Sequence, residues 1–134
     1  MPLLLDTHVL IWVVLEAKRL GRRTRALIDR AQANDSLLLS AVSFWEIARL
    51  VRDGRFEIDS EPAAWRKGVL DGGFQEVALD GDIGIRAADL GGLTGDPIDR
   101  FIVATALTRG AAVVTADQSI LSWRSSLVRH DASR

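Results

Sequence analysis

The N-terminal stretch Leu3-Leu4-Leu5-Asp6-Thr7-His8 sets the fold of this chain. Three successive leucines, with no polar residue between them, are typical of a strand that is buried on both faces of a sheet. Asp6 ends this strand, and the apolar run at residues 9–15 predicts a helix that is buried over most of its surface and that Gly21 ends. Open α/β sheets bind ligands at the carboxyl ends of their strands. The stretch therefore places one carboxylate where a ligand site is expected.

Helical patterns alternate with short apolar segments along the rest of the chain. Further strands are expected at residues 36–39, 74–79 and 111–115, with a weaker one at 126–128. Further helices are expected at residues 22–33, 40–53, 60–70, 83–90 and 97–109, with a short helical turn at 117–123. This order predicts a three-layer α/β/α sandwich with a mainly parallel central sheet. We find no repeat and no linker, so residues 1–134 are expected to form one domain.

The composition narrows the class of protein. Of the 134 residues, 48% are hydrophobic. The chain has 17 basic and 18 acidic side chains, so its overall charge does not indicate binding to nucleic acid. The absence of cysteine excludes a disulfide framework, a thiolate zinc site and a cysteine nucleophile, and it fits a reducing cytoplasm. No apolar stretch approaches the roughly 20 residues that span a bilayer. A cytoplasmic protein without a signal peptide or membrane segment is expected.

Three further acids fall where later segments return to the edge of the sheet that holds Asp6. Asp117 follows the fourth strand, whereas Glu46 and Asp99 lie in the first turns of helices. Four carboxylates in one cleft repel each other unless protons or a cation neutralise them. Their hard oxygen ligands suit Mg²⁺ or Mn²⁺, which bind phosphate oxygens as well. The four acids therefore predict a metal site that hydrolyses phosphodiester bonds.

Each of these three acids also has a local structural explanation. Glu46 lies three residues after Ser43, which is a capping-box pattern in which the glutamate only bonds the backbone. Asp99 lies three residues after Asp96, which is expected to cap the helix there. Asp117 would cap the short turn that follows it. The acid at the end of the first strand has no such explanation, because a charge there is costly unless it is solvated or paired.

Other α/β proteins also gather acids at a strand edge. A receiver-type domain needs a lysine late in the chain, but the lysines are Lys18 and Lys67. A haloacid-dehalogenase-like phosphatase needs a second acid two residues after Asp6, where His8 stands. No GxxxxGKS/T or GxGxxG pattern is present, which disfavours nucleotide binding. A non-catalytic RNA- or partner-binding module on the same fold stays the alternative, although such a module needs no clustered negative charge facing phosphates.

Four segments resemble the four motifs of PIN-domain ribonucleases, in the family's order and spacing. They are Leu5–Trp12, Ser40–Ala48, Asp96–Ala106 and Val113–Asp117. More narrowly, the chain resembles the VapC toxins of bacterial toxin–antitoxin pairs. The resemblance implies a three-layer α/β fold, cleavage of RNA with Mg²⁺ or Mn²⁺, and a small VapB-like antitoxin as partner. We expect a homodimer as well.

The resemblance also assigns roles to the acids. It makes Asp6, Glu46 and Asp99 the principal catalytic metal ligands, and Asp117 completes the site. The chain departs from the pattern at residues 94–95. Related sequences often carry a histidine or another polar group just before the Asp-Pro element, where this chain has threonine and glycine. The departure concerns a local contact with substrate and leaves the metal site intact.

Neighbours of the acids are candidates for supporting roles. Arg100 is a candidate partner for a phosphate or an acid, because a guanidinium fork suits both. Thr115 is expected to orient Asp117 or water at the metal, and His8 is close enough in sequence to touch the site. The alternative is that His8 is merely exposed or packed at the start of its helix and that Thr115 is only a threonine at the end of a strand.

Tryptophan is a further signal. Trp12, Trp45 and their neighbours carry more apolar surface than one small core needs, which predicts contact with an antitoxin helix or with a second copy of the chain. The alternative is that both tryptophans fill the core.

Overall fold

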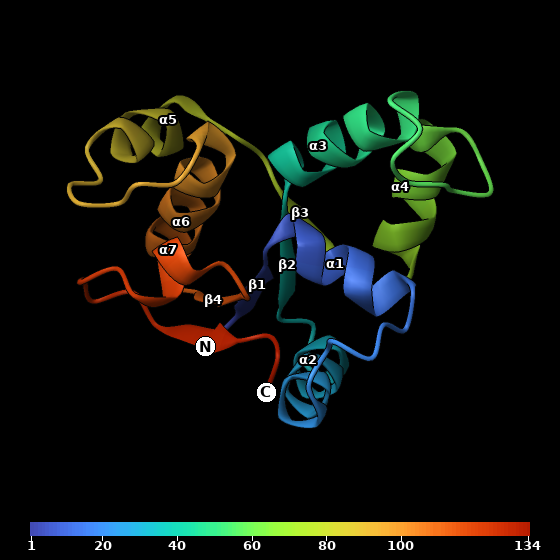
Figure 1. The fold of residues 1–134 in the computed structure, drawn as a ribbon, viewed down its shortest axis with the longest axis horizontal. Coiled ribbons are helices and arrows are strands. Elements are labelled where there is room, and N and C mark those ends of the chain that lie inside the picture. The colour runs from blue at the N-terminus through green and yellow to red at the C-terminus, as the bar shows by residue number, and fades with distance from the viewer.

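A computed structural model describes residues 1–134 and contains one central sheet. Its five parallel strands lie in the order β3-β2-β1-β4-β5. They are β1 (Leu3–Leu5), β2 (Leu37–Ser40), β3 (Gln75–Val77), β4 (Ala112–Thr115) and β5 (Arg129–Asp131). The predicted parallel sheet is confirmed, and the N-terminal leucine strand is its centre (Figure 1).

Helices cover both faces of this sheet. They are α1 (Thr7–Val14), α2 (Arg22–Ala33), α3 (Ala41–Arg52), α4 (Pro62–Asp71), α5 (Gly81–Ala88), α6 (Pro97–Arg109) and α7 (Gln118–Leu121). Figure 1 shows α5, α6 and α7 on one side of the sheet and α1, α2 and α4 on the other. Helix α3 lies at the border, because Val42 packs into the first apolar layer and Phe44 into the second. The three-layer α/β/α sandwich is confirmed.

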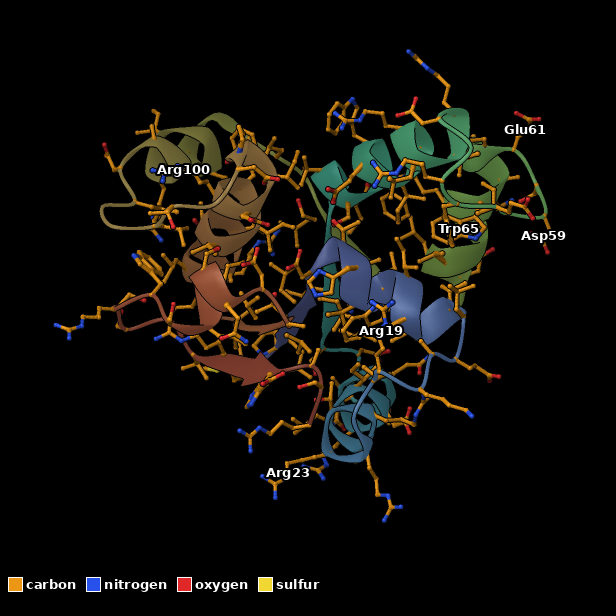
Figure 2. All side chains as sticks on the ribbon, in the orientation of Figure 1. Arg19, Arg23, Asp59, Glu61, Trp65 and Arg100 are labelled. Atoms are coloured by element: carbon orange, nitrogen blue, oxygen red, sulfur yellow. The ribbon has the colours of Figure 1, made fainter.

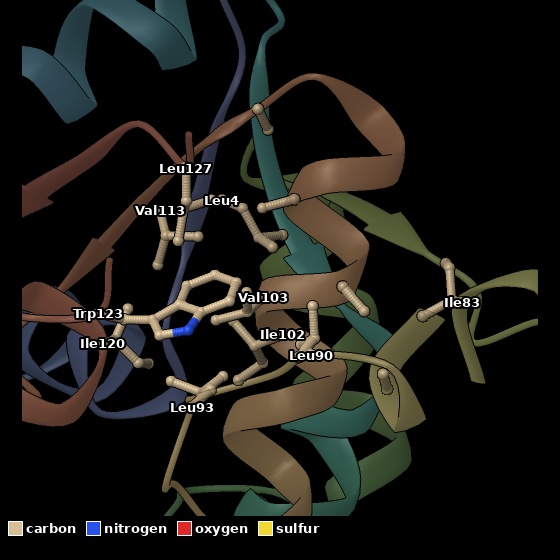
Figure 3. Close-up of a cluster of buried hydrophobic side chains, with 14 of the residues drawn as sticks. Leu4, Ile83, Leu90, Leu93, Ile102, Val103, Val113, Ile120, Trp123 and Leu127 are labelled. Atoms are coloured by element: carbon tan, nitrogen blue, oxygen red, sulfur yellow. The ribbon is translucent and has the colours of Figure 1, made fainter. Parts of the chain in front are cut away.

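The strands supply side chains alternately to the two apolar layers. Leu4 and Val113 pack under α5, α6 and α7, whereas Leu5 and Val114 pack under α1 and α2. This arrangement explains why β1 is apolar at every position: both of its faces are buried. In the first layer the indole of Trp123 lies among aliphatic side chains (Figure 3) and donates a hydrogen bond of 3.0 Å to a loop carbonyl.

Two sequence-based predictions were wrong in detail. Helix α1 ends at Val14, well before Gly21, because the chain turns at Glu16 with a positive φ of 51°. The last strand is residues 129–131 and not 126–128; it is a polar edge strand that pairs only with β4 and gives no apolar signal. Trp45 is 52% exposed, so the alternative that both tryptophans fill the core is wrong for this residue.

None of the helices combines the length and the apolar character that crossing a membrane requires.

Candidate metal centre

Three aspartates meet at the carboxyl edge of the sheet. Asp6 ends β1 and caps α1, where its Oδ1 accepts a hydrogen bond of 2.8 Å from the Thr7 amide. Asp117 follows β4, the neighbour of β1, and its Oδ1 accepts hydrogen bonds of 2.8 Å from both the amide and the hydroxyl of Ser119. Asp99 lies in the first turn of α6, and its carboxyl contacts that of Asp117 through a hydrogen bond. The fold therefore joins residues that are more than a hundred positions apart in sequence.

Thr115, the last residue of β4, connects two of these acids. Its hydroxyl donates a hydrogen bond of 2.7 Å to Asp6 Oδ2 and accepts one of 3.0 Å from the Asp117 amide. Both oxygens of Asp6 are thus hydrogen-bonded, which offsets part of the cost of burying this carboxylate at 3% exposure. Thr115 makes the contact expected of a residue that orients Asp117.

The charges of the acids are strongly coupled. Burial, the hydrogen bond with Asp117 and the charges of Asp6 and Asp96 raise the pKa of Asp99 to about 8. Burial also raises the pKa of Asp6, although His8 and Thr115 oppose the shift. For Asp117 burial acts in the same direction, but hydrogen bonds from Ser119 and Asp99 outweigh it and lower the pKa. At neutral pH, Asp99 therefore holds a proton that it donates to the Asp117 carboxylate.

Glu46 differs from the three aspartates in its contacts. It lies half-buried on α3, and its side chain makes no hydrogen bond or ion pair. No three Asp, Glu or His side chains lie close enough together, as they stand, to enclose a metal ion. The capping-box alternative for Glu46 is wrong, because Ser40 caps α3 and accepts a hydrogen bond of 3.1 Å from Val42. Ser43 instead shares a buried hydrogen bond of 2.8 Å with the Thr7 hydroxyl.

The capping predictions for the two other acids are confirmed. Asp96 caps α6 by accepting a hydrogen bond of 3.0 Å from the Asp99 amide, and Asp117 caps α7. For Asp117 the structural and the functional explanation therefore coexist, because capping uses Oδ1 and the carboxyl still contacts Asp99.

Arg100 does not pair with an acid. Its guanidinium is committed to backbone carbonyls at the C-terminal end of α5 and in the loop that follows: Ala87, Ala88, Leu90 and Leu93. Figure 2 shows Arg100 beside α5. The last carbonyls of a helix need such donors because no intrahelical partner exists for them. Arg100 therefore anchors α5 and its loop and contacts no acid.

Gly95 is a site residue that sequence reasoning noted only as a departure from the family pattern. A Cβ atom at this position would lie 2.8 Å from both Cβ and Oδ2 of Asp99, which is closer than such atoms approach. The loop therefore passes directly over the Asp99 carboxyl, and any side chain at position 95 would displace it. A glycine four residues before a candidate ligand was the available signal.

His8 lies at the site, as its position in the sequence suggested. Its Nε2 accepts a hydrogen bond of 3.0 Å from the Ala116 amide, and its Nδ1 lies 3.4 Å from Asp6 Oδ2. The imidazole also packs edge-on against Trp12, with 5.2 Å between the ring centroids.

Comparisons with known proteins agree with this architecture. Ribonuclease VapC22 of Mycobacterium tuberculosis (strain ATCC 25618 / H37Rv) is 31% identical over 122 residues, which are 90% of this chain and 91% of that protein. The crystal structure of VapBC2 from Rickettsia felis, bound to a DNA fragment from its promoter, matches with a TM-score of 0.73 at 13% identity over 97% of this chain and 98% of that chain.

A second solved structure, DNA-bound VapBC from Salmonella typhimurium, matches with a TM-score of 0.71 at 18% identity over 98% of both chains. At these identities the two solved structures show a common fold. The family model described as PIN domain matches residues 3–122. Together with the identity to VapC22 over most of both sequences, this match shows that the chain belongs to the PIN domain family.

Proposed function

We propose that this PIN-domain protein is a ribonuclease that hydrolyses phosphodiester bonds of RNA with Mg²⁺ or Mn²⁺ and acts as the toxin of a toxin–antitoxin pair. The observation that carries the proposal is the contact between the Asp99 and Asp117 carboxyls beside the buried Asp6. Membership in the PIN domain family and the likeness to a protein named as a ribonuclease support the class of reaction.

The donor chemistry of the site fits a hard divalent cation. The raised pKa of Asp99 beside Asp117 shows that this pair of carboxyls is unfavourable when both are charged, and the positive charge of a bound cation would offset that repulsion. Carboxylate oxygens are the ligands that Mg²⁺ and Mn²⁺ prefer. Asp6, Asp99 and Asp117 would hold the ion, and Glu46 would complete the set from α3.

Such an ion supplies positive charge that polarises a phosphodiester and stabilises the oxygen that leaves. Other groups of the protein hold the carboxylates that would bind the ion. Thr7 and Thr115 fix the Asp6 carboxylate by one hydrogen bond to each oxygen, and Ser119 fixes one oxygen of Asp117. Asp99 would give up its proton when the cation binds. Because these groups are held by the fold before substrate arrives, little reorganisation is needed at the moment of reaction.

The toxin–antitoxin assignment includes two partners, a small antitoxin and a second copy of this chain. The solved structures with this fold include VapBC complexes, and this chain exposes large apolar side chains that a folded monomer leaves uncovered: Val14, Leu15, Trp45 and Ile85. Co-expression with the small protein encoded next to it tests this part. Co-purification in a stable complex is expected, and a chain that stays monomeric beside that protein would contradict it.

Cleavage of a labelled single-stranded RNA tests the enzymatic part. We expect cleavage with Mg²⁺ or Mn²⁺, none with EDTA, and loss of at least about a hundredfold in rate for Asp6→Asn and Asp99→Asn while the far-UV circular dichroism is unchanged. Asp53→Asn is the control, because Asp53 is an exposed acid at the other end of α3. Cleavage that persists in EDTA would contradict the metal mechanism. A fully folded wild type that cleaves no RNA in any metal would contradict the ribonuclease.

A further inference from the structure

His8 connects two parts of the site that come from distant segments of the chain. Its Nε2 accepts a hydrogen bond of 3.0 Å from the Ala116 amide, which lies just beyond the last residue of β4. An imidazole nitrogen that accepts a hydrogen bond carries no proton, so the proton of the neutral ring is on Nδ1. That nitrogen lies 3.4 Å from Asp6 Oδ2. One ring therefore faces the Asp6 carboxylate on one side and the turn that leads to Asp117 on the other.

These contacts close a ring of polar groups. Asp6 Oδ2 accepts a hydrogen bond from the Thr115 hydroxyl, and that hydroxyl accepts one from the Asp117 amide. The neighbouring amide of Ala116 donates a hydrogen bond to His8 Nε2, and His8 Nδ1 lies 3.4 Å from Asp6 Oδ2. Thr115 and His8 thus bind successive amides of the same turn. Together they fix the position of the Asp117 backbone relative to the Asp6 carboxylate.

The orientation of the imidazole is itself supported by packing. The ring of Trp12, one turn further along α1, meets it edge-on at 5.2 Å between centroids. The Trp12 ring is itself held by Arg19, whose guanidinium lies over the ring at 5.7 Å from its centre. A side chain that packing holds in one rotamer can impose its geometry on the groups it binds.

We infer that His8 is a positioning residue that holds the turn between β4 and α7, and with it Asp117, at a fixed distance from Asp6. Like-charged carboxylates tend to move apart, and the ring of contacts opposes this movement in the metal-free protein. The consequence is a preformed pair of ligands and a higher affinity for the divalent cation. The inference rests on the proposed metal site and names a residue that the ligand set does not include.

The test compares four variants by their affinity for Mn²⁺ in the absence of RNA, measured by water proton relaxation, and by the exchange rate of the Ala116 amide in NMR. His8→Leu has similar bulk without an acceptor, and we expect Mn²⁺ binding about tenfold weaker and faster exchange at Ala116. His8→Gln places a carbonyl oxygen near the position of Nε2 and should restore both values. His130→Leu removes the other histidine, which makes no side-chain hydrogen bond, and should change neither.

His8→Asn gives a second route if His8→Leu fails to fold, because its shorter amide reaches toward Asp6 but not Ala116. We expect it to exchange faster at Ala116 and to bind Mn²⁺ more weakly than His8→Gln. A folded His8→Leu that binds Mn²⁺ as tightly as wild type would overturn the inference, and so would a loss that glutamine does not restore. If wild type binds no Mn²⁺, the proposed metal site fails, and unchanged Ala116 exchange in His8→Leu then overturns the positioning role separately.

Discussion

At the scale of single residues, the protonated carboxyl of Asp99 is the most consequential group in the metal-free protein. Its pKa of about 8 lies far above the value of 3.8 for an unperturbed aspartate, chiefly because it is buried beside other acids. Between these two pH values the folded protein binds a proton that the unfolded chain does not. The free energy of unfolding therefore decreases as the pH rises through this window.

This linkage predicts a pH dependence of stability. For metal-free wild type we expect Tm to fall as the pH rises from about 5 to about 9, because Asp99 and Asp6 both have raised pKa values in the folded state. The lowered pKa of Asp117 acts in the opposite direction only at lower pH. Asp99→Asn should flatten the decline and raise Tm at the alkaline end. Differential scanning calorimetry in EDTA measures this, and equal slopes for both proteins would contradict the assignment.

A second prediction concerns the glycine that faces Asp99. Gly95→Ala places a methyl group where Asp99 Cβ and Oδ2 would lie only 2.8 Å away, so the carboxyl must move. We expect weaker Mn²⁺ binding and slower RNA cleavage, each by about tenfold. Gly91→Ala in the same loop is the matched control, because no atom lies within 4 Å of its added Cβ. If both variants bind Mn²⁺ equally, the close approach has no functional role.

The sequence was informative about which acids lie at the carboxyl edge of the sheet and uninformative about the contacts of their neighbours. Asp6 could be singled out because an acid at the end of a buried apolar strand is costly unless it is solvated or paired, although the structure shows that it also caps α1. The roles of Arg100 and His8 depend on which backbone groups lie near them in space. Several of those backbone groups, among them Leu90 and Ala116, come from loops whose conformation no periodicity predicts.

At the scale of secondary structure elements, Arg100 joins α6 to the end of α5. Its guanidinium binds carbonyls from the last turn of α5 and from the loop that leads toward the site, among them Ala87 and Leu93. Arg100→Leu should therefore lower the free energy of unfolding by about 2–3 kcal/mol, because charged hydrogen bonds are lost and buried carbonyls stay unpaired. Urea denaturation measures the change.

The matched control is Arg86→Leu, because Arg86 lies exposed on α5 and its side chain makes no hydrogen bond. That variant should be nearly neutral for stability. If Arg100 bound phosphate instead, its leucine variant would raise KM for RNA with little loss of stability. That outcome would contradict the anchoring role.

A buried pair of hydroxyls joins α3, the helix that carries Glu46, to the junction of β1 and α1. Thr7 and Ser43 share a hydrogen bond of 2.8 Å, and both are buried. Ser43→Ala should destabilise the protein by about 1–2 kcal/mol by leaving the threonine hydroxyl without a partner. Adding Thr7→Val should cost less than the sum of the single changes. Strict additivity in a double-mutant cycle would contradict a direct interaction.

The boundaries of a helix or strand could be predicted where neighbouring residues set them, but not where contacts with distant segments set them. The start of α6 was predictable because Asp96 and the proline after it form a local cap. The end of α1 and the position of β5 were not predictable in this way. The first depends on a turn with positive φ at Glu16, and the second on a polar edge strand that only its pairing with β4 defines.

At the scale of the whole molecule, the parallel sheet brings acids from distant parts of the sequence to one edge. Because β1 and β4 are adjacent and parallel, the acids that follow them lie at one edge. Helices α5, α6 and α7 cover one face of the sheet, α1, α2 and α4 cover the other, and α3 stands at the border (Figure 1). Asp99 reaches the site from the first group and Glu46 from α3.

The fold class and the edge on which the acids lie were predictable from alternating apolar segments and helices. That the Glu46 side chain makes no hydrogen bond was not predictable, because this depends on the exact orientation of α3 relative to the sheet. The carboxyls of Asp99 and Asp117, in contrast, interact with each other.

The most direct test of the metal centre is the anomalous diffraction signal of Mn²⁺ in crystals of the wild-type protein. A single strong peak, or two adjacent peaks, should lie at the carboxyl edge of the sheet within bonding distance of Asp99 and Asp117, with Asp6 and Glu46 as the next nearest ligands. Mn²⁺ found only elsewhere on the protein, with Asp99 still in contact with Asp117, would contradict the account.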